Sequence, residues 1–392
     1  MNINFPSLLR GSKPNLSYAY ALKLLLILAN ILIGSIAPSI SFLLSIMIFS
    51  CLRRKEKSLF IINIFSLSFF AAVTYSSRAF LLIESDDYIR YYDSYINASN
   101  LNKAIYFEEP GLLWFYDIIH LISPSLTSSG LSFLTLFFTL LILGCFFYVL
   151  CFYNLKLKKI GICFSFIYLL VSVDYMNQLV RQSIALIFIL FILLNISTIK
   201  KFFLLILSFT FHFSTLPILL LFYLIKNFSA KKIVIFAIIF TFSIVIIFNT
   251  PYIQNYLGRL SYYSFNIYNI ELNWYIKYIA LILVLSLFFK GCNENQFWNR
   301  LLTILAILVI ITIPLGLLSL RLFSLYIIFF IGLHFYLLLE SQPPILLFFL
   351  IIFFILKTMN ILLVNENIND YFSLWQTYDK YALNPFYYFS EY

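Results

Sequence analysis

The chain has 392 residues, of which 62% are hydrophobic, 20% aromatic and 11% charged, with a net charge of +10 and a mean hydropathy of +0.96. A soluble globular protein carries about 25% charged residues, so this composition excludes a water-soluble fold. Continuous apolar runs of about 20 residues favour membrane-crossing helices over a β-barrel. The sequence therefore predicts an all-α, polytopic transmembrane helical bundle of about 11–13 membrane segments with short outer loops.

The positive charge lies at the ends of the apolar runs, with basic clusters at 53–57, 156–159, 200–201 and 226–232. Lys and Arg collect in the cytoplasmic loops of membrane proteins. No cluster is interleaved with the exposed aromatic residues that a groove for single-stranded nucleic acid requires. We therefore expect residues 1–392 to form a single integral membrane domain in contact with the lipid bilayer, and no nucleic-acid partner.

The first apolar run covers about 18–52 and contains Gly34 and Pro38, so it is either one kinked helix or two short helices. The later expected spans are 58–80, 127–151, 160–177, 182–199, 233–250, 273–290, 301–319, 322–339 and 344–363.

The stretch 202–225 decides the topology of all the later spans. As a single span it places Lys226, Lys231 and Lys232 outside, whereas a hairpin that turns at 212–214 keeps them inside. Each arm of about eleven residues is too short to cross fully. We therefore expect a re-entrant hairpin, which membranes tolerate where the turn is lined by protein or water.

The acidic residues concentrate in three segments that this topology places outside. These are a first outer loop with an interfacial helix at 84–125, a second outer loop at 250–273 and an outer C-terminal tail at 365–392. Within the first, the apolar stretch 112–123 carries Asp117 and His120 and comes after Pro110 and Gly111, a favourable helix start. It therefore predicts a helix that lies in the membrane interface rather than one that spans.

The first outer loop combines acids and tyrosines, namely Asp86, Asp87, Tyr88, Tyr91, Tyr92, Tyr95 and, further on, Glu109. Carboxylates near a bilayer surface act as general bases, metal ligands or simply solvated charges. The tyrosines either belong to an interfacial aromatic girdle or offer flat faces and hydroxyl groups to sugar rings. The residues alone leave both alternatives open.

A second polar group lies between two apolar runs, in 174–182. If this segment is helical, Asp174, Gln178, Arg181 and Gln182 share one face. A charge at such a depth normally faces a bundle interior or a wet cavity. Either Asp174 and Arg181 lock two helices together, or Arg181 binds an anion, since a guanidinium contacts phosphate in bidentate fashion.

His212 lies at the expected hairpin turn, and either bonds to a neighbour or acts as a base or phosphate donor near neutral pH. Arg321, at an outer boundary, and Arg259, in the second outer loop, are either snorkelling anchors or part of a site. The chain has no glycine-rich phosphate loop, so an ATP-driven pump is not expected.

Several short motifs succeed one another in a fixed order. They are Arg78 at the end of a span, Asp86-Asp87-Tyr88-x-x-Tyr91, Glu109-Pro110-Gly111, Arg181-Gln182-x-x-Ala185 and Phe211-His212-Phe213-Ser214, with Arg321 and a closing Asn384-Pro385-Phe386-Tyr387. This succession resembles the O-antigen and exopolysaccharide repeat-unit polymerases of the Wzy type, specifically the EpsG-like family.

The resemblance implies a glycosyltransferase in the inner (plasma) membrane of a bacterium, as a multi-pass protein. It would join oligosaccharide repeat units linked to undecaprenyl pyrophosphate on the outer face of that membrane, for O-antigen, capsule or exopolysaccharide. Its partners would be the lipid-linked glycan donor and acceptor and a chain-length regulator (co-polymerase). The donor carries its own activation, so neither a cofactor nor a metal is expected.

The resemblance also suggests roles. We expect the pyrophosphate to be held by Arg181 and Arg321, with Arg259 and Arg78 as further candidates. His212 is the base or a phosphate contact, and Asp86, Asp87 and Glu109 are competing bases or orient sugar hydroxyls. The expected sugar contacts are Tyr88, Tyr91, Tyr92, Gln178 and Gln182. The alternative functions are a lipid-linked oligosaccharide flippase or other transporter, and an O-antigen ligase.

Overall fold

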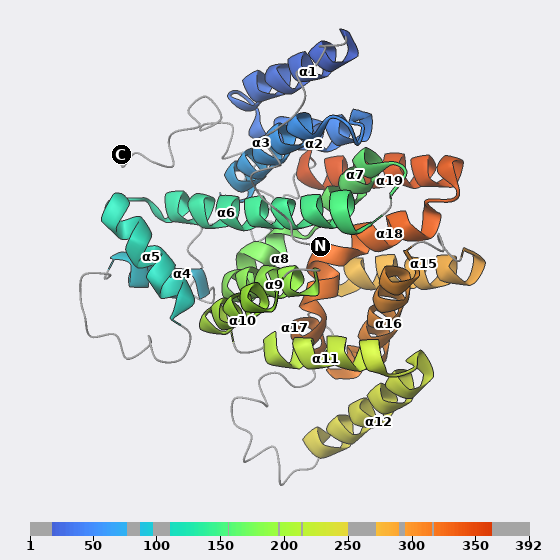
Figure 1. Cartoon of the computed structure of the whole chain (residues 1–392). Helices are drawn as coiled ribbons and strands as arrows, with labels where there is room; N and C mark the ends of the chain where they lie inside the picture. The colour runs from blue at the N-terminus through green and yellow to red at the C-terminus, as the bar shows by residue number, and fades with distance from the viewer. Residues whose placement is uncertain are drawn as a thin grey trace. The chain divides into compact units, whose positions relative to one another are not determined.

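The computed structural model describes residues 18–76, 87–96, 110–155, 157–194, 197–212, 215–249, 272–289, 295–315 and 317–362 (Figure 1). All regular secondary structure in these ranges is helical. Four of the helical stretches are long and apolar enough to cross a bilayer: Lys57–Ser76, Ser128–Asn154, Gln296–Leu315 and Leu322–Leu339. The predicted polytopic, helical membrane fold is therefore confirmed.

Contacts between residues divide the chain into two compact units. The first comprises the described parts of Met1–Leu169, Val173–Phe213 and Phe349–Tyr392, and the second those of Leu170–Ser172 and Ser214–Phe348. The chain therefore passes from one unit to the other more than once.

The first unit is built around α3 (Lys57–Ser76) and α6 (Ser128–Val149), which pack against each other (Figure 1). The other helices of this unit are α1 (Tyr18–Gly34), α2 (Pro38–Cys51), α4 (Asp87–Ile96), α5 (Gly111–Ile122), α7 (Ile160–Leu170), α8 (Val173–Gln178), α9 (Val180–Leu193) and α10 (Thr198–Phe211). The first apolar run is thus two helices, since α1 ends before Pro38 begins α2. The helix α3, with 20 residues, is about 30 Å long, which matches the hydrocarbon layer.

Hydrogen bonds show that α3 and α6 run antiparallel. At one end the buried Asn177 of α8 joins both helices, because its Nδ2 donates to the Tyr75 carbonyl at 3.1 Å and its Oδ1 accepts from the Ser132 hydroxyl at 3.3 Å. At the other end Arg54, just before α3, donates from Nη2 to the carbonyl of Phe152, just after α6, at 2.9 Å. The α8 segment therefore lies at the end where α3 stops and α6 starts.

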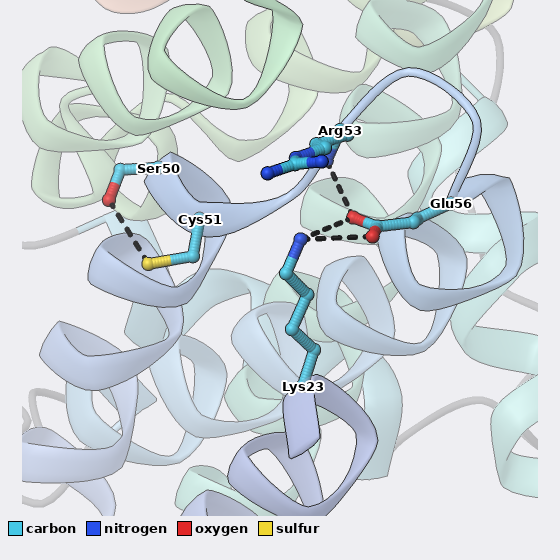
Figure 2. A network of polar contacts seen from close by, with 5 residues as sticks. All are labelled: Lys23, Ser50, Cys51, Arg53 and Glu56. Atoms are coloured by element: carbon cyan, nitrogen blue, oxygen red, sulfur yellow. Dashed lines mark hydrogen bonds and ion pairs between the residues drawn. The ribbon is translucent and has the colours of Figure 1, made fainter. Parts of the chain in front are cut away.

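The Arg54 end carries an ion pair (Figure 2). Lys23 of α1 reaches Glu56, with its Nζ 2.9 Å from Oε1 and 2.8 Å from Oε2, and the Arg53 amide donates to Oε2 at 2.7 Å. The side chains of Lys23 and Glu56 are only 15% and 7% exposed. This carboxylate therefore fastens α1 to the turn between α2 and α3.

One expected span, and one segment whose shared polar face depended on a continuous helix, are both broken. The expected span 160–177 is split into α7 and α8, and in between the Ser172 amide donates to the Ile328 carbonyl at 3.2 Å. The segment 174–182 is interrupted at Leu179, whose φ and ψ of −107° and 48° are not helical. The condition for a shared face of Asp174, Gln178, Arg181 and Gln182 is therefore not met.

The second unit contains α11 (Thr215–Asn227), α12 (Ala230–Asn249), α15 (Leu272–Phe288), α16 (Gln296–Thr312), α17 (Leu317–Leu325), the π-helical turn η8 (Tyr326–Phe330) and α18 (Ile331–Leu339). The helix α16 packs against α12, α15 and α18. His334 is fully buried between α16 and η8, with Nδ1 2.8 Å from the Tyr326 hydroxyl and Nε2 3.2 Å from that of Thr303. Both ring nitrogens are paired, so His334 stabilises the packing of this unit.

The expected turn at 212–214 coincides with a helix break, since α10 ends at Phe211 and α11 begins at Thr215. Phe213 and Ser214 lie outside the described residues, and the re-entrant hairpin at 202–225 stays a prediction. The second outer loop at 250–273, up to its last two residues, and the whole C-terminal tail at 365–392 also lie outside the described residues. The helix α19 (Pro343–Leu362) begins in the second unit and ends in the first.

Candidate functional site

Five of the predicted site residues have described side chains: Tyr91, Tyr92, Arg181, Gln182 and His212. Asp86, Glu109, Arg78 and Arg259 lie outside the described residues. Asp87 and Tyr88 belong to α4, Gln178 to α8 and Arg321 to α17, but their side chains lie outside the description. All five described side chains belong to the first unit.

The central contact joins Arg181, in the first turn of α9, to Tyr91 of α4. The Arg181 Nε donates to the Tyr91 hydroxyl at 3.1 Å, and the guanidinium carbon lies 5.5 Å from the centre of the Tyr91 ring. A hydrogen bond and a cation–π contact from one tyrosine fix both the position and the plane of a guanidinium. Two predicted site residues 90 positions apart in the sequence are thus brought into contact.

A buried apolar cluster holds these elements together. It consists of Tyr95, Leu112, Tyr116, Ile119, Leu126, Leu131, Val180, Ile184, Ala185 and Phe211, with Tyr91 and Tyr92 packed against it. The cluster therefore joins α4, α5, the start of α6, the start of α9 and the end of α10. Figure 1 shows α5 crossing the end of α6 rather than continuing along it.

Two tyrosines tie α4 to the turn between α5 and α6. The hydroxyl of Tyr95 donates to the Ser123 carbonyl and accepts from the Leu126 amide, while that of Tyr92 donates to the Leu126 carbonyl at 3.1 Å. The two rings are stacked with their centres 6.1 Å apart. Tyr95 was singled out with the other tyrosines of the first outer loop but was not among the expected sugar contacts, although its i, i+4 spacing from Tyr91 was a usable signal.

His212 comes directly after the cluster, because the preceding residue, Phe211, is one of its members. The Phe211 ring lies 5.7 Å from that of Phe188, and its position requires a glycine at 111. A Cβ at Gly111 would be 2.8 Å from the Phe211 ring and 2.9 Å from the Thr210 carbonyl carbon. The start of α5 therefore packs closely against the end of α10, directly before His212.

Tyr116 is a buried member of the cluster against which Tyr91 packs. Burial raises the pKa of the Tyr116 hydroxyl far above its ordinary value, against a smaller lowering by the Thr135 hydroxyl and with a small further raising by Tyr91. Tyr116 therefore remains neutral and adds no negative charge beside Tyr91. Gln182, the neighbour of Arg181, is 3% exposed, so it lies within the protein rather than on its surface.

The arrangement gathers an oriented guanidinium, a histidine-bearing helix end and an aromatic helix at one end of the first unit. No curated protein and no solved structure matches the chain. A model of the EpsG family, however, matches residues 79–377, which is more than half of the chain and includes this site. The resemblance inferred from the order of the motifs is thereby confirmed, and the chain belongs to the EpsG family. Membership in this family indicates a polymerase-type function in polysaccharide synthesis.

Proposed function

We propose that this protein is a membrane glycosyltransferase that polymerises oligosaccharide repeat units linked to undecaprenyl pyrophosphate on the outer face of the bacterial plasma membrane. Family membership supports a polysaccharide polymerase. The observation that carries the finer proposal is the Arg181 guanidinium, held at 3.1 Å by Tyr91, which packs against the apolar cluster that includes Phe211, the residue before His212. A fixed guanidinium suits a diphosphate leaving group, because its planar fork matches phosphate oxygens.

In the proposed reaction, a hydroxyl group of the acceptor sugar attacks the anomeric carbon of the donor glycan. The new glycosidic C–O bond forms as the C–O bond to the pyrophosphate breaks, and undecaprenyl pyrophosphate leaves with the electron pair. The hydroxyl proton passes to a base on the protein. Negative charge grows on the pyrophosphate in the transition state, so a cation fixed beforehand stabilises that state more than the ground state.

In this scheme Arg181 holds the pyrophosphate and His212 is the base or a second phosphate contact. Arg321, Arg259 and Arg78 remain further candidates for the pyrophosphate, and Asp86, Asp87 and Glu109 remain competing bases or sugar contacts. Both sugars must also be oriented, because two hydroxyl-rich reactants gain much of their rate from correct placement. The scheme requires neither a nucleotide nor a metal, since the bond to the pyrophosphate is already activated.

The substitution Arg181→Lys tests the assignment, because it retains the charge and removes the planar fork. We expect the rate of polymerisation to fall by about 10²-fold or more, the loss that results from removal of one charge-stabilising donor. The purified protein is reconstituted in vesicles with lipid-linked repeat units, and the appearance of lipid-linked dimers and longer glycans is measured.

Arg53→Lys, at the opposite end of the first unit, is the matched control and should polymerise at the wild-type rate. The amount of protein in the membrane and its thermal unfolding show that both variants are folded. A wild-type rate for Arg181→Lys would contradict the assignment. Movement of intact repeat units across the vesicle membrane without polymer would instead indicate a flippase.

A further inference from the structure

We infer that Tyr91 is a positioning residue, which orients the Arg181 guanidinium for a diphosphate ligand instead of serving as a sugar contact. The inference rests on the proposed function, and it names the device that makes Arg181 a specific anion site. It changes the role that the sequence suggested for Tyr91.

Tyr91 contacts the guanidinium at two points. Its hydroxyl accepts a hydrogen bond from Nε at 3.1 Å, and its ring centre lies 5.5 Å from the guanidinium carbon. The hydrogen bond fixes one edge of the planar group, and the ring restricts its tilt. A long arginine side chain otherwise samples many rotamers, and fixing them in advance removes that entropic cost from ligand binding.

Tyr91 is itself held in place by its own helix. Tyr95, one turn further along α4, is fully buried and bonds through its hydroxyl to Ser123 and Leu126. Residues at i and i+4 lie on the same helix face, so the anchored Tyr95 determines the direction of Tyr91. The chain of contacts thus runs from the turn before α6, through α4, to the guanidinium.

A tyrosine also suits this role electrostatically. A carboxylate partner would orient the guanidinium equally well, but its negative charge would oppose a phosphate that approaches the same cation. The phenol hydroxyl accepts the same hydrogen bond and brings no charge. Tyr91 therefore orients Arg181 without lowering the attraction that an anionic ligand experiences.

The experiment compares Tyr91→Phe, which loses the hydroxyl, with Tyr91→Leu, which loses the hydroxyl and the ring. Polymerisation by protein in vesicles is measured together with its inhibition by inorganic pyrophosphate. For Tyr91→Phe we expect about a tenfold fall in kcat/KM and a similar rise in the inhibition constant, the effect of one hydrogen bond to a charged group. Tyr91→Leu should show a larger change in both quantities.

The double variant Tyr91→Phe/Arg181→Lys provides the decisive comparison. If Tyr91 acts through Arg181, the double variant should be no worse than Arg181→Lys alone, because coupled residues are not additive. Tyr20→Phe is the matched control, since it removes a tyrosine hydroxyl bonded to the Ser58 hydroxyl at 2.8 Å at the opposite end of the unit. It should leave both measurements unchanged.

Three results would overturn the inference. In the first, both Tyr91 variants polymerise and are inhibited by pyrophosphate as the wild type is, while Arg181→Lys is impaired. In the second, the double variant loses as much activity as the sum of the losses of its two single variants. The third is a higher KM for the acceptor with unchanged pyrophosphate inhibition, which would make Tyr91 a sugar contact. A fully active Arg181→Lys would instead remove the pyrophosphate assignment itself, and so separates failure of the proposed function from failure of this inference.

Discussion

The two ends of the α3–α6 pair hold their cations in different ways. At the end where α3 begins, Lys23 is paired with the Glu56 carboxylate at 2.8 Å, and both side chains are mostly buried. At the end where α3 stops, the neutral Tyr91 orients Arg181, and its hydroxyl accepts a hydrogen bond from the Arg181 Nε at 3.1 Å. An opposite charge thus holds the first cation in a mostly buried setting, whereas an uncharged aromatic hydroxyl is among the groups that hold the second.

We connect this difference with two roles, a structural one for Lys23 and the proposed ligand-binding one for Arg181. A partly buried charge is stable when an opposite charge lies beside it, and the Lys23–Glu56 pair meets that condition while it ties α1 to α3. A cation that must attract an anionic ligand is better oriented by a neutral group. We therefore expect substitutions at the Lys23 end to change stability, and substitutions at the Arg181 end to change the reaction.

The largest effect on stability is expected for Glu56→Gln. It leaves Lys23 partly buried without its carboxylate and removes the strong acceptor of the Arg53 amide. The free energy of unfolding should fall by about 2 kcal/mol, between the values for exposed and for fully buried pairs. Thermal unfolding in detergent, followed by tryptophan fluorescence, measures the change.

The control is the double variant Lys23→Met/Glu56→Gln, which removes the stranded charge and should recover most of the loss. Polymerisation per folded molecule should stay at the wild-type level in both variants. An unfolding temperature equal to that of the wild type in Glu56→Gln would mean that the ion pair contributes nothing to the packing of α1.

A smaller effect, divided between stability and activity, is expected for Gly111→Ala. The new methyl group would approach the Phe211 ring to 2.8 Å and the Thr210 backbone to 2.9 Å, so the end of α10 must shift. We expect a loss of about 1–2 kcal/mol in the free energy of unfolding, as for modest overpacking. Because His212 comes directly after Phe211, polymerisation should fall by more than this loss of stability explains.

The comparison with Gly111→Ser sharpens this prediction, since a slightly larger side chain should lower activity further. The two measurements are the unfolding temperature and the polymerisation rate per folded molecule. A normal rate in both variants would show that the position of the α10 end, and with it His212, is unimportant for the reaction.

The sequence predicted the helical spans well but not the contacts between them. Spans such as 127–151 correspond closely to α6 (Ser128–Val149), because a continuous apolar run fixes a membrane helix almost by length alone. The break before Val173 falls within a stretch that is still apolar, so hydropathy carried no sign of it, whereas the break at Leu179 falls in a polar segment between two apolar runs that is equally compatible with a helix. At the first break the Ser172 amide makes a tertiary hydrogen bond to the Ile328 carbonyl, which a single sequence does not display.

The sequence selected residues that the structure brings into contact, but it did not predict the contact itself. Arg181 and Tyr91 were both selected, but a contact across 90 positions has no periodicity that a single sequence displays. Tyr91 was therefore interpreted by its chemistry as a sugar contact. Lys23 and Glu56 were not recognised as partners, since the basic block around 53–57 was fully explained by the charge bias of cytoplasmic loops.

The last prediction concerns the outward face of α5 and the interfacial position predicted for this helix, rather than a change in activity or stability. Trp114, Ile118, Leu121 and Ile122 recur with helical spacing and are 52%, 57%, 84% and 80% exposed, while Leu112, Tyr116 and Ile119 face the apolar cluster. A helix of 12 residues is about 18 Å long and cannot cross the hydrocarbon. An apolar outward face on so short a helix indicates that α5 lies in the membrane interface.

A spin label at position 121, in vesicles and in a background without other reactive cysteines, reports the surroundings of that face. We expect a high collision rate with oxygen, which concentrates in lipid, and a low rate with a water-soluble nickel chelate. A label at the exposed Lys55 serves as the aqueous control and should give the reverse order. If position 121 also gave the aqueous order, α5 would lie clear of the bilayer. The depth at which the α4–α5 pair holds Arg181 would then have to be set by α6 and α9 alone.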